Sequence, residues 1–145
     1  MRILLLAAAM LPIAAAQNHV EYVGGTASKL QSGTSGSLDI SDQHYLAFYS
    51  KKTQLRVPYD RVDLVEYGQQ VDRRLLMAVV ISPIFLLSKQ RKHFLTIGYL
   101  DDENSHQALV FRVDKNSIRP ALVSLEARTG QRIQYQDADA RKTGK

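Results

Sequence analysis

The chain has 145 residues, a formal net charge of +5 and no cysteine. This length fits a single domain, and the lack of cysteine excludes disulfides, so the fold must depend on its apolar core. The moderately basic balance suits nucleic acid, anionic lipid head groups or acidic polymers as partners.

Residues 1–16 have the three parts of a secretory signal peptide. A positive Arg2 is followed by an apolar stretch, Ile3 to Leu11, and by three small residues that end at Ala16. We expect cleavage after Ala16 and export to the periplasm or the extracellular space, which argues against nucleic acid as a partner. The alternative is an uncleaved anchor helix.

Seven short β-strands are predicted in the first three quarters of the chain. Apolar residues alternate with polar ones in several of them, 45–49 is apolar on both faces, and 94–100 is rich in β-forming residues. Turn residues separate the strands. Gly24-Gly25 is predicted to form a bulge or bend within the first strand. The stretch Gly33 to Gly36 is predicted to form a turn. The predicted strands are 20–30, 38–40, 45–49, 55–57, 62–67, 94–100 and 108–113.

The pattern after residue 113 changes to helical spacing. We expect a helix from Ser117 to Thr129, with Ser117 as its cap, Pro120 in its first turn and Gly130 at its end. Its apolar positions are Ile118, Ala121, Leu122 and Leu125. Residues 17–135 therefore form one predicted domain, and 136–145 a polar, flexible tail.

Several of these segments resemble the pleckstrin-homology-like superfold, in particular its GRAM-type and small bacterial members. The resemblance covers roughly Tyr22 to Gln131. It implies a mainly β fold, with a bent seven-stranded antiparallel sheet or partly open barrel that a carboxy-terminal helix plugs at one end. Many members bind lipid head groups or short peptides. Phosphoinositide-binding members use a basic motif at the first hairpin, where this chain has only Lys29. The segments that carry the resemblance are 36–40, 46–48, 57–62 and the helix through Leu122 and Leu125.

No catalytic, cofactor or metal site is predicted. The four histidines, at positions 19, 44, 93 and 106, are not spaced as metal ligands. Residues 101–103 are acidic but lack the alternating ligands, the glycine and the distal glutamate of a calcium loop. Ser35 lacks the surroundings of an activated nucleophile. We therefore expect a protein that is not an enzyme.

The least usual segment is the apolar run from Leu75 to Leu87, inserted between the fifth and sixth predicted strands with basic residues on both sides. As a helix it would span roughly 20 Å, whereas a membrane's hydrocarbon core is about 30 Å thick. Ser82-Pro83 predicts a bend because proline lacks an amide hydrogen and restricts the residue before it. We expect an apolar hairpin insert over 71–92 that returns its basic flanks to the same side.

An apolar segment of this kind is buried in its own core, against another chain, or in lipid. The main hypothesis is a non-enzymatic binding or scaffolding module of the cell envelope that contacts an anionic membrane surface through this insert. The alternative is a protein-interaction module whose insert docks on a partner or on a second copy as a homo-oligomer. The predicted contact residues are Leu75, Leu76, Met77, Val79, Val80, Ile81, Pro83, Ile84, Phe85, Leu86 and Leu87, with the basic flanks Arg73, Arg74, Lys89, Arg91 and Lys92.

Overall fold

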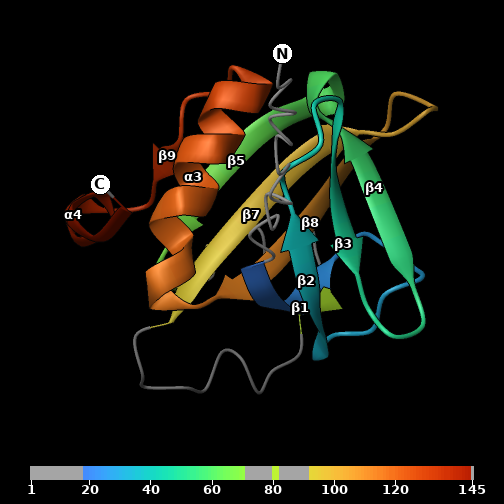
Figure 1. Cartoon of the computed structure of the whole chain (residues 1–145), viewed down its shortest axis with the longest axis horizontal. Coiled ribbons are helices and arrows are strands. Elements are labelled where there is room, and N and C mark those ends of the chain that lie inside the picture. Colours follow the sequence, from blue (N-terminus) through green and yellow to red (C-terminus); the bar gives the residue numbers. More distant parts are fainter. Residues whose placement is uncertain (1–17, 71–79, 82–91, 145) are drawn as a thin grey trace, which may run out of the picture.

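The fold is mainly β, with two helices near the carboxyl terminus (Figure 1). The computed structural model describes residues 18–70, 80–81 and 92–144, with 80–81 described for the backbone alone. Within these ranges nine strands form one sheet. They are β1 (Asn18–Gly25), β2 (Thr34–Asp39), β3 (Tyr45–Tyr49), β4 (Gln54–Pro58), β5 (Val62–Gly68), β6 (Val80–Ile81), β7 (His93–Leu100), β8 (His106–Val113) and β9 (Gln134–Tyr135).

The strand order is β4-β3-β2-β1-β8-β7-β5-β9, and β6 pairs with β1 off this path. A short 3-10 helix, η1 (Tyr59–Arg61), links β4 to β5. The predicted antiparallel arrangement is confirmed for the seven main strands but not for the whole sheet, because β9 pairs with β5 in parallel. The sheet is therefore mixed, and its described strands do not close into a barrel.

The sheet bends where its ladders shift register. The β1–β8 pairing shifts between Tyr22 and Gly24, next to the predicted bulge at Gly24-Gly25. A second shift lies between Val62 and Leu64 in the β5–β7 pairing. Such irregularities bend a strand and increase its twist. The bend lets one face of the sheet curve around the core.

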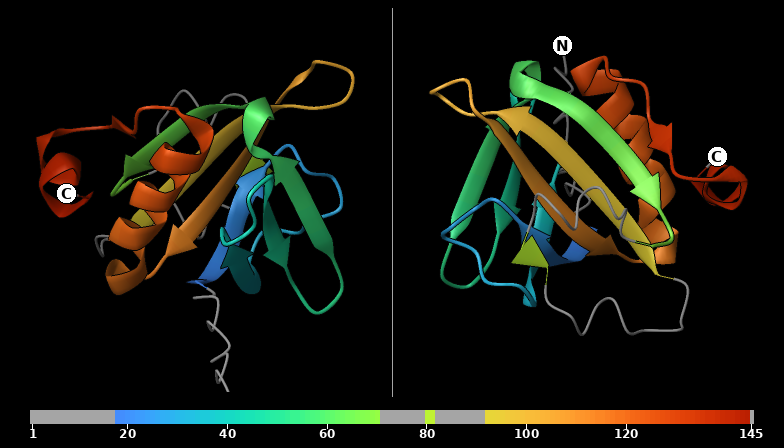
Figure 2. Two further views of the ribbon diagram at one scale, coloured as in Figure 1. Left: turned by 45° about the horizontal axis from the view of Figure 1, so that its top comes forward. Right: turned by 180° about the vertical axis from the view of Figure 1, so that it is seen from behind.

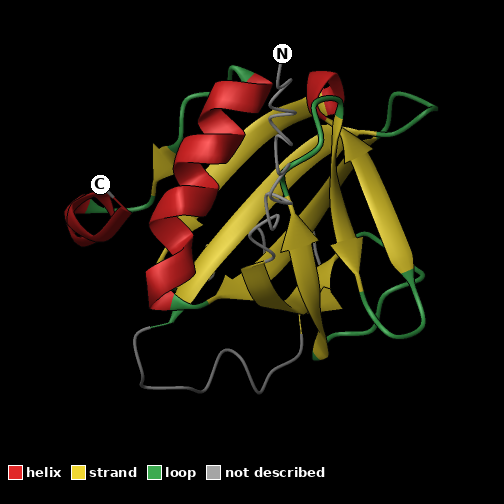
Figure 3. Cartoon of the chain, in the orientation of Figure 1, coloured by secondary structure: helices red, strands yellow, loops and turns green. Residues whose placement is uncertain are grey.

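The core occupies the concave face, where α3 packs across the sheet (Figure 3). Phe111 on β8 is fully buried in the core, and its ring centroid lies 5.2 Å from that of Phe48 and 5.9 Å from that of Tyr22. Leu95 and Ile97 of β7 are also fully buried in it. These residues alternate along their strands with residues on the other face, which is the pattern that the sequence shows.

The long helix α3 (Lys115–Thr129) begins two residues before its predicted start. The predicted cap at Ser117 is wrong, because Asp114 occupies the cap position and the Ser117 amide bonds to its carbonyl. Pro120 therefore lies in the second turn and not in the first. Gly130, with φ of 71°, ends the helix in the left-handed conformation as predicted. The buried face consists of Ile118, Ala121, Leu122 and Leu125, also as predicted.

The prediction of a polar, flexible tail over 136–145 is corrected, because residues 138–144 form a second helix, α4 (Ala138–Gly144). The Asp137 carboxylate caps it by accepting the Ala140 amide at 2.6 Å. Ala140 is fully buried in the core cluster, and Gly144 lies close to Tyr135 and Leu122. Small residues make these contacts, so no periodic apolar pattern marks the helix.

The turn predicted at Gly33 to Gly36 lies earlier in the chain. Thr34 to Gly36 belong to β2, and the connection from β1 runs through residues 26–33. Only Gly33, with φ of 90°, has the left-handed backbone that the turn needs. This longer connection forms one wall of the pocket described below.

Candidate functional site

Most of the predicted contact residues lie outside the described part of the chain. Of the apolar run, only Val80 and Ile81 are described, as the backbone of β6. Of the basic flanks, only Lys92 is described; it is half-buried and directly precedes β7. The remaining predicted contacts, from Arg73 to Val79 and from Pro83 to Arg91, stay predictions.

The two ends of the inserted segment are held side by side. β5 and β7 are antiparallel neighbours, and Gly68 near the end of β5 pairs with Phe94 near the start of β7. Paired residues in such a ladder lie about 5 Å apart. The described ends of the insert are therefore neighbours on the sheet.

The middle of the apolar run also meets the sheet. Ile81 pairs with Gly24, and Val80 with Gly25. Gly24 and Gly25 lie beyond the part of β1 that pairs with β2, which covers residues 18–22. Figure 2 shows β6 beside β1 when the molecule is seen from behind. Phe94 of β7 and Val110 of β8 are buried as well, and neither belongs to the core cluster.

A pocket of about 340 Å³ lies at the end of the sheet where three connections meet. The first wall is the β1–β2 connection, the second is the β3–β4 turn with the start of β4, and the third is the β7–β8 hairpin. The lining residues are Thr26, Ala27, Ser28, Lys29, Leu30, Thr53, Gln54, Leu55, Tyr99, Asp101 and Gln107.

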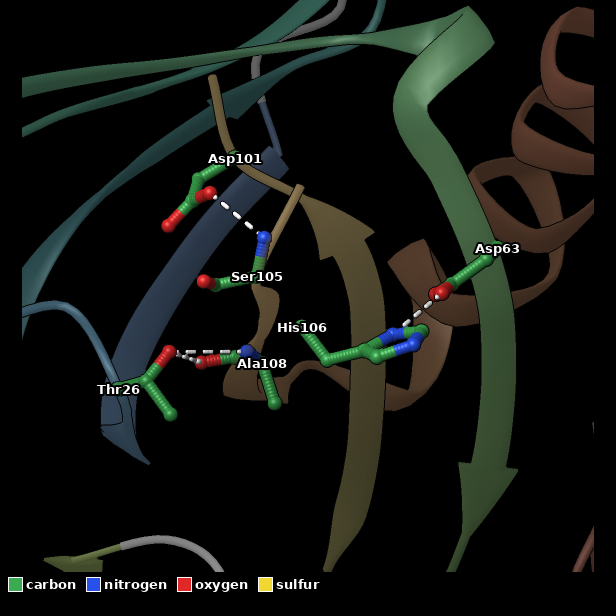
Figure 4. A network of polar contacts seen from close by, with 6 residues as sticks. All are labelled: Thr26, Asp63, Asp101, Ser105, His106 and Ala108. Atoms are coloured by element: carbon green, nitrogen blue, oxygen red, sulfur yellow. Dashed lines mark hydrogen bonds and ion pairs between the residues drawn. The ribbon is translucent and has the colours of Figure 1, made fainter. Parts of the chain in front are cut away.

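The first wall is held to β8 by Thr26 (Figure 4). The Thr26 amide donates to the Ala108 carbonyl at 2.9 Å, and the Ala108 amide donates to the Thr26 Oγ1 at 3.0 Å. A turn closed by the Leu30 amide and the Ala27 carbonyl at 3.1 Å then directs Leu30 into the core. Ser28 and Lys29 are left exposed between these fixed points.

The hairpin wall is organised by the Asp101 carboxylate. Its Oδ1 accepts the Ser105 amide at 2.9 Å, as Figure 4 shows, and the Glu103 amide at 2.9 Å. Its Oδ2 accepts a hydrogen bond from the side-chain amide nitrogen of Gln107 at 2.8 Å. These bonds, led by the one from Ser105, lower the pKa of Asp101. Arg61 also donates to the Asp101 carbonyl at 3.0 Å. Asp101 therefore presents a fixed negative charge at neutral pH.

The pocket lining also includes the half-buried residues Leu55 and Tyr99. Burial raises the pKa of Tyr99, and the nearby Asp101 carboxylate adds to this effect. Burial also raises the pKa of Tyr22, beneath the first wall, to about 12. Both phenols are neutral at physiological pH, so they contribute no charge to the pocket.

Other chemistry-bearing side chains lie apart from this pocket. The Tyr67 hydroxyl is 2.6 Å from His93 Nδ1, and the two rings stack. Burial, and then the charge of Lys115, lower the pKa of His93. His106 pairs with Asp63 at 2.9 Å and is largely exposed (Figure 4). Within the described ranges no three His, Cys, Asp or Glu side chains are placed to hold a metal ion.

The pocket was not predicted from the sequence, which shows only that residues 101–103 are acidic. The lining residues come from three stretches that are far apart in the chain, and none of them forms a motif by itself. Only the register of β1 with β8 brings Thr26 next to Ala108. A pocket of this kind leaves no local signal in a sequence.

No helix in the described part of the chain is long and apolar enough to span a membrane. Comparison of the sequence with known protein families gives no match, and none of the curated proteins matches it.

Proposed function

We propose that this protein is a non-enzymatic binding module of the cell envelope that associates with an anionic membrane surface through residues 75–87 and their basic flanks. The observation that carries the proposal is the pairing of Gly68 with Phe94. Because the segment starts and ends at neighbouring strands, its two basic flanks begin from the same place. That arrangement suits a one-sided insertion, in which an apolar tip enters the interface and cations meet lipid head groups.

The same proposal includes the pleckstrin-homology-like assignment of the fold. It is supported by the order of the seven main strands, β4-β3-β2-β1-β8-β7-β5, and by α3 packing across the bent sheet. The inserted segment between β5 and β7 is the feature that distinguishes this chain from a plain member of that superfold.

A second candidate function is a protein-interaction module. It is favoured by β6, whose pairing with β1 shows that part of the apolar run adopts strand geometry against a sheet. A partner, or a second copy of the chain, would then cover the rest of the run by strand addition or apolar packing.

Vesicle binding separates the two candidates. The exported protein should cosediment with vesicles that contain anionic lipid, and the bound fraction should fall as salt rises, because salt screens the flanking cations. The variant with glutamine at the five basic flank positions, 73, 74, 89, 91 and 92, should lose most of this binding. A matched control replaces five exposed cations elsewhere, Lys51, Lys52, Arg119, Arg132 and Lys142, and should lose less.

Equal loss in the two variants would mean that only net charge matters, and it would refute the proposed site. Concentration-dependent self-association without vesicle binding would support the second candidate. Deletion of residues 75–87 supplies a further test, because a folded product is expected under both candidates. A product that cannot fold would place the segment in the core of the domain and refute both.

A further inference from the structure

Strand β4 forms one edge of the sheet. It is last in the strand order, and within the described part of the chain no strand pairs with its outer side (Figure 1). The opposite edge differs, because β9 covers β5 there. An edge strand presents a row of unpaired backbone groups, which another chain can join as a further strand. β4 is therefore a candidate interaction surface.

The register fixes which residues of β4 direct their backbone groups outward. Directly after β4, the Tyr59 amide donates to the His44 carbonyl at 2.9 Å. Bonded pairs alternate in an antiparallel ladder, so the odd-numbered residues of β4 bond to β3 in the same way. The amides and carbonyls of Gln54 and Arg56 therefore face away from the sheet. Both residues are exposed.

The side chain of Arg56 does not shield this edge. Its guanidinium lies 4.8 Å from the centroid of the Tyr45 ring on β3, which holds the side chain over the neighbouring strand. Charged side chains often protect edge strands, but this one is directed back across the sheet. Pro58 limits pairing at the end of β4, because it has no amide hydrogen to donate. The accessible part of the edge is therefore short and spans residues 54–56.

The sequence of this edge suits a second copy of the same strand. In an antiparallel pair with its two-fold axis at Leu55, Gln54 of one copy lies opposite Arg56 of the other, so no like charges meet. The two Leu55 side chains, half-buried in the single chain, also meet there. A two-fold axis at Arg56 would instead place two cations opposite each other, which is destabilising.

The charges beyond the strand favour the same arrangement. Lys51 and Lys52 are exposed on the β3–β4 turn, and Asp60 is exposed on η1 at the other end of β4. Antiparallel pairing brings the turn of each copy beside η1 of the other, so opposite charges meet at both ends of the interface. Arg61 follows Asp60 but donates to the Asp101 carbonyl on the β7–β8 hairpin.

We propose that β4 is a homodimerisation edge, through which two copies pair antiparallel about Leu55 and join their sheets. Gln54 of each copy and Arg56 of the other exchange both backbone hydrogen bonds. So short a ladder gives a weak dimer, with a dissociation constant on the order of 100 µM. The surface consists of described residues alone and is separate from residues 75–87.

Analytical ultracentrifugation of the full exported protein, from low micromolar to millimolar concentration, tests the dimer. Arg56→Pro removes an outward amide and no bond to β3, and an edge strand accepts proline at such a position. Its dissociation constant should rise at least tenfold. The matched control Arg56→Gln keeps the amide, so its constant should stay within about threefold of the wild-type value. Circular dichroism checks that both variants are folded.

Two charge variants test the register without proline. Gln54→Glu places a carboxylate opposite Arg56 of the other copy, and Gln54→Lys places a cation there. The first should tighten the dimer about fivefold, and the second should weaken it by a similar factor. Asn116→Glu, at an exposed position on α3, changes the net charge as Gln54→Glu does and should leave the constant unchanged.

Cross-linking locates the two-fold axis, because the chain has no cysteine of its own. Opposed residues of a non-bonded antiparallel pair have Cα atoms about 4.5 Å apart, a separation that a disulfide can span. Leu55→Cys should therefore form disulfide-linked dimers on mild oxidation faster than Arg56→Cys, although position 56 is the more exposed.

The proposal is overturned if the protein stays monomeric at millimolar concentration, or if Arg56→Pro and Gln54→Lys both dimerise as the wild type does. It is also overturned if deletion of residues 75–87 abolishes self-association, because that result would place the contact in the apolar segment. Failure of the wild type to bind anionic vesicles would refute the proposed membrane contact and leave the β4 dimer unaffected.

Discussion

The Leu125→Ala substitution tests how α3 is held on the sheet. Leu125 is 0% exposed and belongs to the core cluster. The substitution removes three carbon groups, worth about 0.8 kcal/mol each when buried, so the transfer loss is about 2.4 kcal/mol. The sheet beneath the helix limits collapse around the cavity, which adds a further cost. We expect a total loss of about 3 kcal/mol in the free energy of unfolding.

The matched control for this substitution is Val123→Ala, because Val123 lies on the same helix and is 66% exposed. Alanine has the higher helix propensity, so this change should alter stability by less than about 0.5 kcal/mol. Urea unfolding followed by circular dichroism measures both variants. If Leu125→Ala costs less than about 0.5 kcal/mol, or no more than Val123→Ala, the buried face of α3 is assigned wrongly.

Three further predictions follow from other parts of the chain. Ala140→Asp should detach α4 from the core, because a carboxylate would replace a fully buried methyl group. Trypsin should then cleave within α4 faster in this variant than in the control variant Ala138→Asp, whose position is exposed. Burial lowers the pKa of His93, so the neutral imidazole contributes to stability above about pH 6.5 and this contribution is lost as the pH falls. Between about pH 7.5 and about pH 5, the urea midpoint of His93→Gln should therefore depend less on pH than that of the wild type. Amino-terminal sequencing of the exported protein should begin at Gln17, and a retained first methionine would indicate an anchor instead.

The sequence predicted the seven main strands and α3 because each carries a local signal of its own, either an apolar period or a run of β-forming residues. In β3, Leu46 and Phe48 alternate as the core face demands, and in α3 the four buried residues recur at helical spacing. The turn at Gly36 was predicted wrongly because a glycine has two structural uses. Here Gly36 lies under the ring of Phe48, where a side chain would collide, so it serves packing within a strand.

The parts that the sequence did not predict depend on contacts between distant segments. α4 packs through Ala140 and Gly144, whose small side chains carry no hydrophobic period. The pocket exists because Asp101 and Lys29, more than seventy positions apart in the chain, are brought to one end of the sheet. The contact residues predicted in the apolar run remain a hypothesis from composition, apart from the strand position of Val80 and Ile81.

The parallel pairing of β9 with β5 has a practical consequence for protein production. Gln134 and Tyr135 pair with Glu66 and Tyr67, so this short strand occupies backbone groups that β5 would otherwise present to solvent. An uncovered strand of this kind is a template for intermolecular pairing and aggregation. Recombinant versions that end before residue 134 should therefore precipitate more readily than versions that extend through α4, even though the truncation removes no residue of the seven main strands.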